Sequence, residues 1–294
     1  MNPGLKNHIV ADIKRIIPEL PRGLSQASKY ILDHPSDFGL DPIRETGSKA
    51  GVSTYTLIRL AEKLGFKTFD ELREPFRQAL VSTTGGGDQP TWIEELQQHG
   101  ELGKVQAATA RNGMAIVQRS LEHLDPDSLH RITQLLLKAE NVYLMGMRAS
   151  YSLASYFHYV GRMALPALQL IPRHMNSATD DLNNAGPGDV LIAITVTPYS
   201  RETIEACQFA LHKGARLILL SDSEIVSSDL VADETLIASV HSTHHLACYT
   251  GMLAIIETLI GILVAEGGDA AQQRIRSYED LRASTHVYWT GKKG

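Results

Sequence analysis

Cysteine is scarce in this 294-residue chain, which contains only Cys207 and Cys248. No CxxC pair and no Cys/His cluster occurs, so the sequence predicts neither a disulfide framework nor a structural zinc site. Such cysteine usage is typical of proteins from a reducing compartment, and we therefore expect a cytoplasmic protein.

Targeting and membrane signals are also missing. Residues 1–14 lack a basic stretch followed by an apolar core, so we expect no signal peptide. The longest apolar run, 252–265, is shorter than the roughly 20 residues that cross a bilayer, and Glu257 interrupts it. We interpret this run as a buried helix and expect no membrane partner.

Neither sign of charge dominates strongly, because the net charge is only −5. Residues 1–81 contain 12 Lys+Arg against 10 Asp+Glu, whereas the remainder contains 16 against 23. A weakly basic head on an acidic body is compatible with nucleic-acid binding by the head alone.

The order of patterns along the chain predicts an α/β protein in two parts. Residues 81–90 are rich in Ser, Thr and Gly and read as a linker between a helical head, 1–80, and connecting helices at 91–139. From 140 to 294, five short apolar runs alternate with amphipathic stretches, which indicates a parallel five-stranded doubly wound αβα sandwich. Its last helices are expected at 246–265 and 268–287.

The stretch 48–66, SKAGVSTYTLIRLAEKLGF, fits a DNA-binding helix-turn-helix. Such a unit needs small residues where the helices cross, a glycine in the turn and apolar residues facing inward. Counting from Ile43, positions 5, 8, 9, 10, 15 and 18 fit, as Gly47, Ala50, Gly51, Val52, Leu57 and Leu60. The expected DNA-binding residues are Ser53, which also caps the second helix, and Thr54, Tyr55, Thr56 and Arg59. A plain helical hairpin is the alternative.

The head also resembles the N-terminal domain of RpiR-type bacterial transcriptional regulators. The resemblance rests on YILDHP at 30–35, AGVS at 50–53, Thr56, Arg59, LGF at 64–66 and FDEL at 69–72. It implies an all-α helix-turn-helix head that binds operator DNA. The chain departs at Thr46-Gly47, where members usually have Leu-Ala, and glycine there costs about 1 kcal/mol of helix propensity.

Polar residues gather where the predicted strands end, which is where open parallel sheets bind ligands. Helix N-termini at such edges suit an anion. The strand ends are GMRAS at 146–150, TVTPYSRET at 195–203 and LLSDS at 219–223. The alternative is that Ser150, Ser200 and Ser221 are ordinary N-caps.

The second part resembles the sugar isomerase (SIS) domain that RpiR regulators carry, which implies a sugar-phosphate site and an oligomer interface. Gly146 and Ser150 match the first SIS loop, but Arg148 replaces its second glycine, and Pro198 replaces the glycine of the second loop. Because an added arginine also suits carboxylates, the ligand is expected to be a small anion, either a sugar phosphate or a carboxylate. The expected ligand-binding residues are Arg148, Ser150, Thr195, Thr197, Ser200 and Arg201.

Catalysis is not expected. An isomerase needs a base near the substrate carbons, and the candidates are His244, His245 and His174. Neighbouring histidines at i and i+1 point to different sides of a helix and do not make a metal pair. No catalytic residue, metal site or cofactor is therefore predicted, and Glu257 is expected on an exposed stripe of its helix.

Together these observations predict a ligand-responsive transcriptional regulator that binds operator DNA as a homodimer or homotetramer. The alternative is a SIS-type sugar-phosphate isomerase, or carbohydrate-binding protein, with an accessory helical head. A third interpretation is a protein-interaction module ahead of a sensor domain.

Overall fold

The computed structural model describes residues 5–83, 91–244 and 246–289. The chain divides into two compact units, and each is described by itself. One unit contains the described residues up to 91 together with Ser223–Ser228, and the other contains the described residues from Trp92 to Asp222 and from Asp229 onward.

The first unit, the head, is helical throughout its described N-terminal residues. Its helices are α1 (Leu5–Ile16), the 3-10 helix η1 (Ile17–Glu19), α2 (Arg22–Asp33), α3 (Pro35–Leu40), α4 (Ile43–Ala50), α5 (Thr54–Lys63) and α6 (Phe69–Thr83). Their apolar faces form one core, in which the ring of Phe38 meets the rings of Phe69 and Phe76 edge-on. The predicted linker begins within α6, and its residues 84–90 lie outside the described ranges.

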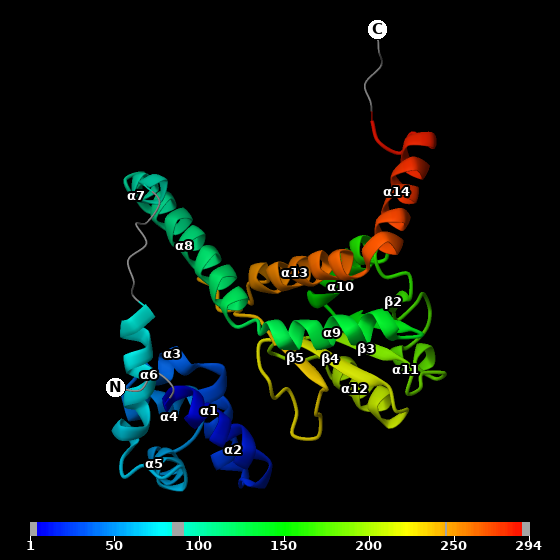
Figure 1. Ribbon diagram of the computed structural model, residues 1–294. Helices are drawn as coiled ribbons and strands as arrows, with labels where there is room; N and C mark the ends of the chain where they lie inside the picture. Colours follow the sequence, from blue (N-terminus) through cyan, green and yellow to red (C-terminus); the bar gives the residue numbers. More distant parts are fainter. Residues whose placement is uncertain (1–4, 84–90, 245, 290–294) are drawn as a thin grey trace. The chain divides into compact units, whose positions relative to one another are not determined.

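The second unit, the body, has a parallel sheet flanked by helices (Figure 1). Its strands are β1 (Val142–Gly146), β2 (Leu168–Ile171), β3 (Val190–Ile194), β4 (Arg216–Ser221) and β5 (Glu234–Ile237). Its helices are α7 (Thr91–Gln97) at the unit boundary, α8 (Gly100–Glu122), α9 (Pro126–Lys138), α10 (Ser150–Gly161), α11 (Ala178–Asp181), α12 (Arg201–His212), α13 (Thr250–Glu266) and α14 (Gly268–Ser284). The five predicted strands and their parallel arrangement are confirmed.

The sheet has the order β2-β1-β3-β4-β5, so the chain reverses its winding direction between β1 and β3. Alternate strand residues face opposite sides. Leu144, Ile192 and Leu220 join a core with α9, α10 and α13, while the residues between them face the side that α12 covers. The carboxyl ends of β1 and β3 lie together at the reversal point, where Gly146 pairs with Ile194. Doubly wound sheets place their ligands at such a point.

The last two helices differ from their expected bounds. α13 begins at Thr250 rather than 246, because the backbone N–H of Cys248 donates to Val240 O (2.8 Å) and holds the preceding segment outside the helix. Leu246, expected inside this helix, is largely exposed. α14 ends at Ser284. Among the described residues, no single helix is long and apolar enough to cross a membrane; α13 and α14 pass that test only as a pair bent by 110°.

The C-terminal end of α8 packs against α13 and is hydrogen-bonded to the backbone just beyond the sheet. The hydroxyl of buried Ser120 donates to Ile116 O (2.8 Å) and accepts from the N–H of Ser239, just beyond β5 (2.9 Å). A Cβ added to Gly251 of α13 would lie 2.2 Å from that hydroxyl oxygen. Only glycine at 251 therefore lets the two helices approach this closely.

Candidate functional site

The bend of the predicted helix-turn-helix is made by the residues expected for it. Gly51 ends α4 with a φ of 64°, a left-handed conformation that glycine adopts without strain. Ser53 then caps α5, and its Oγ accepts from the N–H of Thr56 at 3.2 Å. Leu57 and Leu60 are buried under α5, as the pattern predicts.

The opposite face of α5 presents polar side chains to solvent. Ser53, Thr54 and Arg59 are exposed, the side chain of Tyr55 is 67% exposed, and Thr56 is partly buried. The Arg59 guanidinium lies 6.0 Å from the centre of the Tyr55 ring. Among the described residues, the side chains of Thr54, Tyr55 and Arg59 have no hydrogen-bond partner, so their donors are available to an outside surface.

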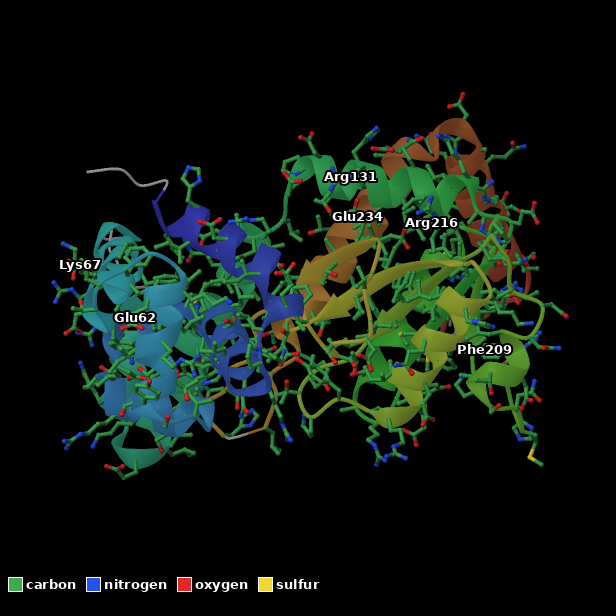
Figure 2. All side chains as sticks on the ribbon, turned by 90° about the horizontal axis from the view of Figure 1, so that it is seen from below. Glu62, Lys67, Arg131, Phe209, Arg216 and Glu234 are labelled. Carbon is green, nitrogen blue, oxygen red and sulfur yellow. The ribbon has the colours of Figure 1, made fainter. Side chains whose placement is uncertain are left out.

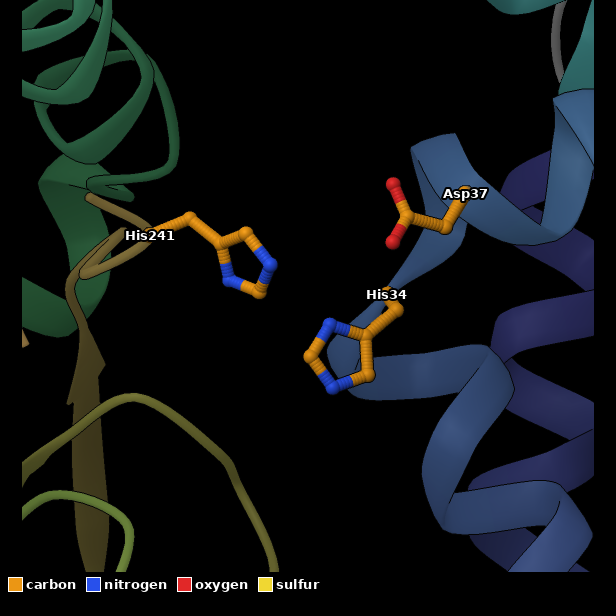
Figure 3. Close-up of side chains that lie close together, drawn as sticks. All are labelled: His34, Asp37 and His241. Carbon is orange, nitrogen blue, oxygen red and sulfur yellow. The ribbon is translucent and has the colours of Figure 1, made fainter. Parts of the chain in front are cut away.

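The helix before the bend is held by a charged network within the head. Lys49 of α4 pairs with Asp41 (2.8 Å), Glu45 (3.4 Å) and Asp37 (3.8 Å), and the Asp41 hydrogen bond raises the pKa of Lys49. Figure 3 shows Asp37 beside His34 at the start of α3. His241, drawn with them, belongs to the other unit and is not assigned to a site with them.

In the body, the predicted ligand residues come from loops that meet at the carboxyl edge of the sheet. Ser150 opens α10, next to β1, and Thr195 to Ser200 connect β3 to α12. Gly146 is required here, because an added Cβ would lie 2.6 Å from the carbonyl oxygen of Ser150. Arg148 has a left-handed φ of 55° and, like Arg201, is exposed.

Many polar groups at this edge already have partners inside the chain. The hydroxyl of buried Ser150 lies 3.3 Å from the Tyr249 hydroxyl, and the Ser200 hydroxyl donates to Glu202 at 2.5 Å. The N–H of Thr197 donates to both carboxylate oxygens of Asp222, at 3.2 and 3.3 Å. Thr195 is itself buried at this edge.

These contacts contradict the interpretation of the three serines as ordinary N-caps. Ser150 is the first residue of α10, and Ser200 stands at the cap position of α12 without a cap hydrogen bond. Ser221 ends β4 and donates to Asp222 at 3.3 Å.

Two carboxylates at this edge were not predicted. The Ser200 hydrogen bond, the helix backbone and the positive charge of Arg148 together lower the pKa of Glu202, so Glu202 faces the first loop as an anion. Asp222 follows β4 directly, and its place after a strand end was the signal available in the sequence. Proline at 198 offers no N–H, and the Thr197 N–H is taken by Asp222, so the β3–α12 loop has few free donors for an anion.

None of the contacts given above at this edge involves His244 or His174, the candidate bases among the described histidines. His244 is exposed in the loop before α13, near the hydroxyl of Ser242 (3.2 Å), rather than on the helix, and His245 lies outside the described residues. Glu257 is exposed on α13, as expected, and accepts from the hydroxyl of Tyr156.

A groove of about 610 Å³ lies at the other, amino edge of the sheet. Arg131 and Glu234 are bonded to each other there (2.5 Å), and Arg216 pairs with Asp233 (2.5 Å). Figure 2 shows Arg131, Glu234 and Arg216 at this edge. Because these charges are mutually paired, we assign no site to the groove.

Comparisons with known proteins agree with the arrangement. Residues 135–262 match the SIS domain family. The chain is 27% identical over 268 residues to the HTH-type transcriptional regulator YbbH of Bacillus subtilis, covering 88% of this chain and 90% of that one.

Two solved structures share the fold. The sugar isomerase domain of the RpiR transcription factor from Sphaerobacter thermophilus aligns with a TM-score of 0.57, at 20% identity over 60% of this chain and 99% of that one. The NanR protein of Vibrio vulnificus, complexed with ManNAc-6P, aligns with a TM-score of 0.56, at 18% identity over 94% and 98%.

Residues 135–262 therefore match an SIS domain, and a helical head precedes them in the chain. Its resemblance to regulators of the RpiR type, first stated from the sequence, is confirmed.

Proposed function

We propose that this chain is a ligand-responsive transcriptional regulator that acts in the cytoplasm and binds operator DNA through α5. The observation that carries the proposal is the unpartnered, exposed row Thr54, Tyr55 and Arg59 on a helix that follows a glycine bend. Such side chains contact phosphates and base edges in a major groove, and Arg pairs with guanine through two N–H groups. One helix in one groove reads few bases, so the regulator acts as a homodimer or homotetramer.

The body is proposed to bind a small anionic effector at the carboxyl edge of its sheet. Arg148 and Arg201 supply positive charge, and Ser150, Thr195, Thr197 and Ser200 supply hydroxyls. The carboxylates of Asp222 and Glu202 require that the effector also presents hydroxyl or ammonium donors. A phosphorylated or carboxylated sugar has both kinds of group, and NanR, which shares this fold, is complexed with ManNAc-6P.

The effector is proposed to change DNA affinity by competing with contacts inside the chain. Binding at Ser200 and Thr197 exchanges their bonds to Glu202 and Asp222 for bonds to the ligand, and this favours a different loop arrangement. The effect on DNA binding equals the difference in ligand affinity between the two arrangements.

DNA binding is tested with a duplex enriched from a random pool by the wild-type chain. Arg59→Ala is expected to weaken binding about 10- to 100-fold, in line with one lost bidentate base contact. Glu62→Ala, on the same helix and also exposed, is the matched control and should leave binding nearly unchanged. No enriched duplex, or equal binding by the Arg59 variant, contradicts the proposal.

Effector binding is tested by calorimetry with sugar 6-phosphates and organic acids. Ser150→Ala combined with Thr197→Val should weaken binding of any active compound, while Ser284→Ala on α14 is a control remote from the edge. Unchanged affinity in the double variant would show that Ser150 and Thr197 do not bind the effector.

An SIS-type sugar-phosphate isomerase is the second candidate, since the fold is shared with such enzymes. His244 lies in an exposed loop, and the carboxylates of Glu202 and Asp222 accept hydrogen bonds from the chain's own Ser200 and Thr197, which favours the regulator. Turnover of phosphosugars by the purified chain would reverse this preference.

A further inference from the structure

An isoleucine stands among the exposed side chains of α5. Within this helix, all of whose residues the structure describes, Ile58 is the one large aliphatic side chain that is exposed, at 37%. The buried face is made by Leu57, Leu60 and Ala61. Among the described residues, Ile58 belongs neither to the core of the head nor to the partly buried side chains packed against that core. The packing of the head therefore does not account for an isoleucine at this position.

Helix propensity does not account for this isoleucine either. A β-branched side chain loses rotamer freedom in a helix, so isoleucine forms helices less readily than leucine, lysine, arginine or glutamate. All the other exposed positions of α5 carry a polar group, and they are Thr54, Tyr55, Arg59, Glu62 and Lys63. The isoleucine side chain is thus free to contact a surface outside the head.

The spacing along α5 places Ile58 on the surface that we assign to DNA. Residues four apart in a helix lie one above the other on the same face. Ile58 is four residues after Thr54, and Arg59 is four residues after Tyr55, so two rows run side by side. Ile58 and Arg59 differ by about 1.5 Å along the helix axis and by about 100° around it. A duplex that contacts one of these side chains lies within reach of the other.

The two rows differ in chemistry. The Arg59 guanidinium lies 6.0 Å from the centre of the Tyr55 ring, and a cation over an aromatic face is attracted to it. This attraction keeps the charged group in its own row. The neighbouring row contains Thr54 and Ile58, whose side chains both carry methyl groups.

The isoleucine side chain has no hydrogen-bonding atom, which restricts what it can recognise on a duplex. It offers nothing to a phosphate or to the donors and acceptors of a base edge. The C5-methyl group of thymine is the one methyl group that a base presents in the major groove, and apolar side chains recognise it. Contact between the two removes apolar surface of both from water.

The size of the helix limits how far apart the two bases can be. Two adjacent rows are separated by less than the helix diameter, about 10–12 Å with its side chains. Successive base pairs are about 3.4 Å apart along the duplex. The base that Ile58 reaches therefore lies no more than about three steps from the base that Arg59 reaches.

We propose that α5 selects a thymine through Ile58, within about three base pairs of the guanine that Arg59 reads. This inference rests on the proposed function, because it names the base that the same helix selects. The Ile58 side chain covers the thymine methyl group while Arg59 donates to O6 and N7 of the guanine. Ile58 is thus a specificity-determining residue, which adds a preference for one base pair and no attraction for phosphates.

The test uses the full chain and the duplex that the wild type enriches from a random pool. The guanine is located with 7-deazaguanine, which lacks the N7 acceptor and should weaken binding by the wild type but not by Arg59→Ala. Each nearby thymine is then replaced by uracil, which lacks only the C5-methyl group. At one position the wild type should bind the uracil duplex about fourfold more weakly, as expected for one methyl group left in water. Ile58→Ala should bind the thymine and uracil duplexes equally.

The matched control is Leu40→Ala. Leu40 is also an exposed aliphatic side chain of the head, at 67%, but it lies on α3. This variant should keep the wild-type preference for thymine over uracil. Circular dichroism checks that each variant is folded, and Ile58→Ala should melt as the wild type does, because Ile58 is outside the core.

Three outcomes would overturn the inference. The first is a wild type that binds every uracil duplex as tightly as the thymine duplex. The second is a folded Ile58→Ala chain that still prefers thymine. The third is loss of the preference in Leu40→Ala as well. In all three cases the enriched duplex and its dependence on Arg59 still stand, so failure here is distinguishable from failure of the proposed function. A chain that enriches no duplex contradicts both.

Discussion

The polar side chains of the head surface and of the body site are used differently inside the chain. Among the described residues, the side chains of Thr54, Tyr55 and Arg59 on α5 have no hydrogen-bond partner, whereas in the body the hydroxyls of Ser150 and Ser200 and the backbone N–H of Thr197 already do. A surface with unused donors is ready to meet a rigid partner such as a duplex. A site whose groups bond to one another must exchange those bonds for a ligand, and such an exchange is what a switch requires.

The two units also have separate hydrophobic cores, so a core mutation should destabilise only its own unit. This is the largest effect that we expect. Leu60→Ala removes a fully buried side chain of the head, and it should lower the free energy of unfolding of the head by about 3 kcal/mol. Calorimetry should show a head transition that shifts while the body transition stays in place. Leu144→Ala, in the body core, should do the reverse. One transition that shifts equally in both variants would show that the two cores unfold as one.

A smaller effect is expected at the loop after β2 in the body. Burial disfavours the charged form of Asp181, but the N–H, Nε and Nδ2 groups of Arg173 and Asn176 bond its carboxylate (2.6–2.9 Å), and the net effect is a lowered pKa of Asp181. Asp181→Asn should cost about 2 kcal/mol at neutral pH, because charged hydrogen bonds are lost.

The same carboxylate predicts a pH dependence. Because the folded-state pKa of Asp181 lies below its unfolded value, its contribution is present above the unfolded pKa and is lost as the pH falls through the folded one. Urea unfolding at a series of acidic pH values should show a shallower loss of stability in Asp181→Asn than in the wild type. Parallel curves would contradict the role given to this carboxylate.

The smallest expected effect is the loss of stability when either of two serines at helix starts is replaced by alanine. Ser53 caps α5, so Ser53→Ala should lower the stability of the head by about 1 kcal/mol. Ser200 stands at the same position of α12 without a cap hydrogen bond, and Ser200→Ala should change the stability of the body by much less. Thermal unfolding of both variants measures the difference. Equal losses would mean that Ser200 caps its helix in solution.

Much of the fold follows from local patterns. The glycine bend, the Ser53 cap and the inward residues of α5 were predicted because they depend on near neighbours in the sequence. The five strands were predicted because continuous apolar runs mark a sheet covered on both faces. The start of α13 was predicted too early, because the bond from Cys248 to Val240 joins segments that no periodicity relates.

The candidate ligand site was predicted less completely. Strand ends located Ser150, Thr197 and Ser200 correctly at one edge of the sheet. Their partners Glu202, Asp222 and Tyr249 come from separate elements, and which hydroxyl faces which carboxylate depends on tertiary packing. The exposed position of Glu257 on α13 was predicted, because a lone carboxylate in an apolar helix usually marks the side that faces solvent.

The contact between Gly251 and Ser120 has a mechanical consequence. The same hydroxyl that touches α13 is bonded to the backbone beyond β5, so the base of α8 moves only if that strand end or α13 moves with it. Because α8 is one continuous helix of 23 residues, a rotation at this contact would displace its far end by more than its base. The lack of a side chain at Gly251 is what allows α13 to lie this close to Ser120 of α8.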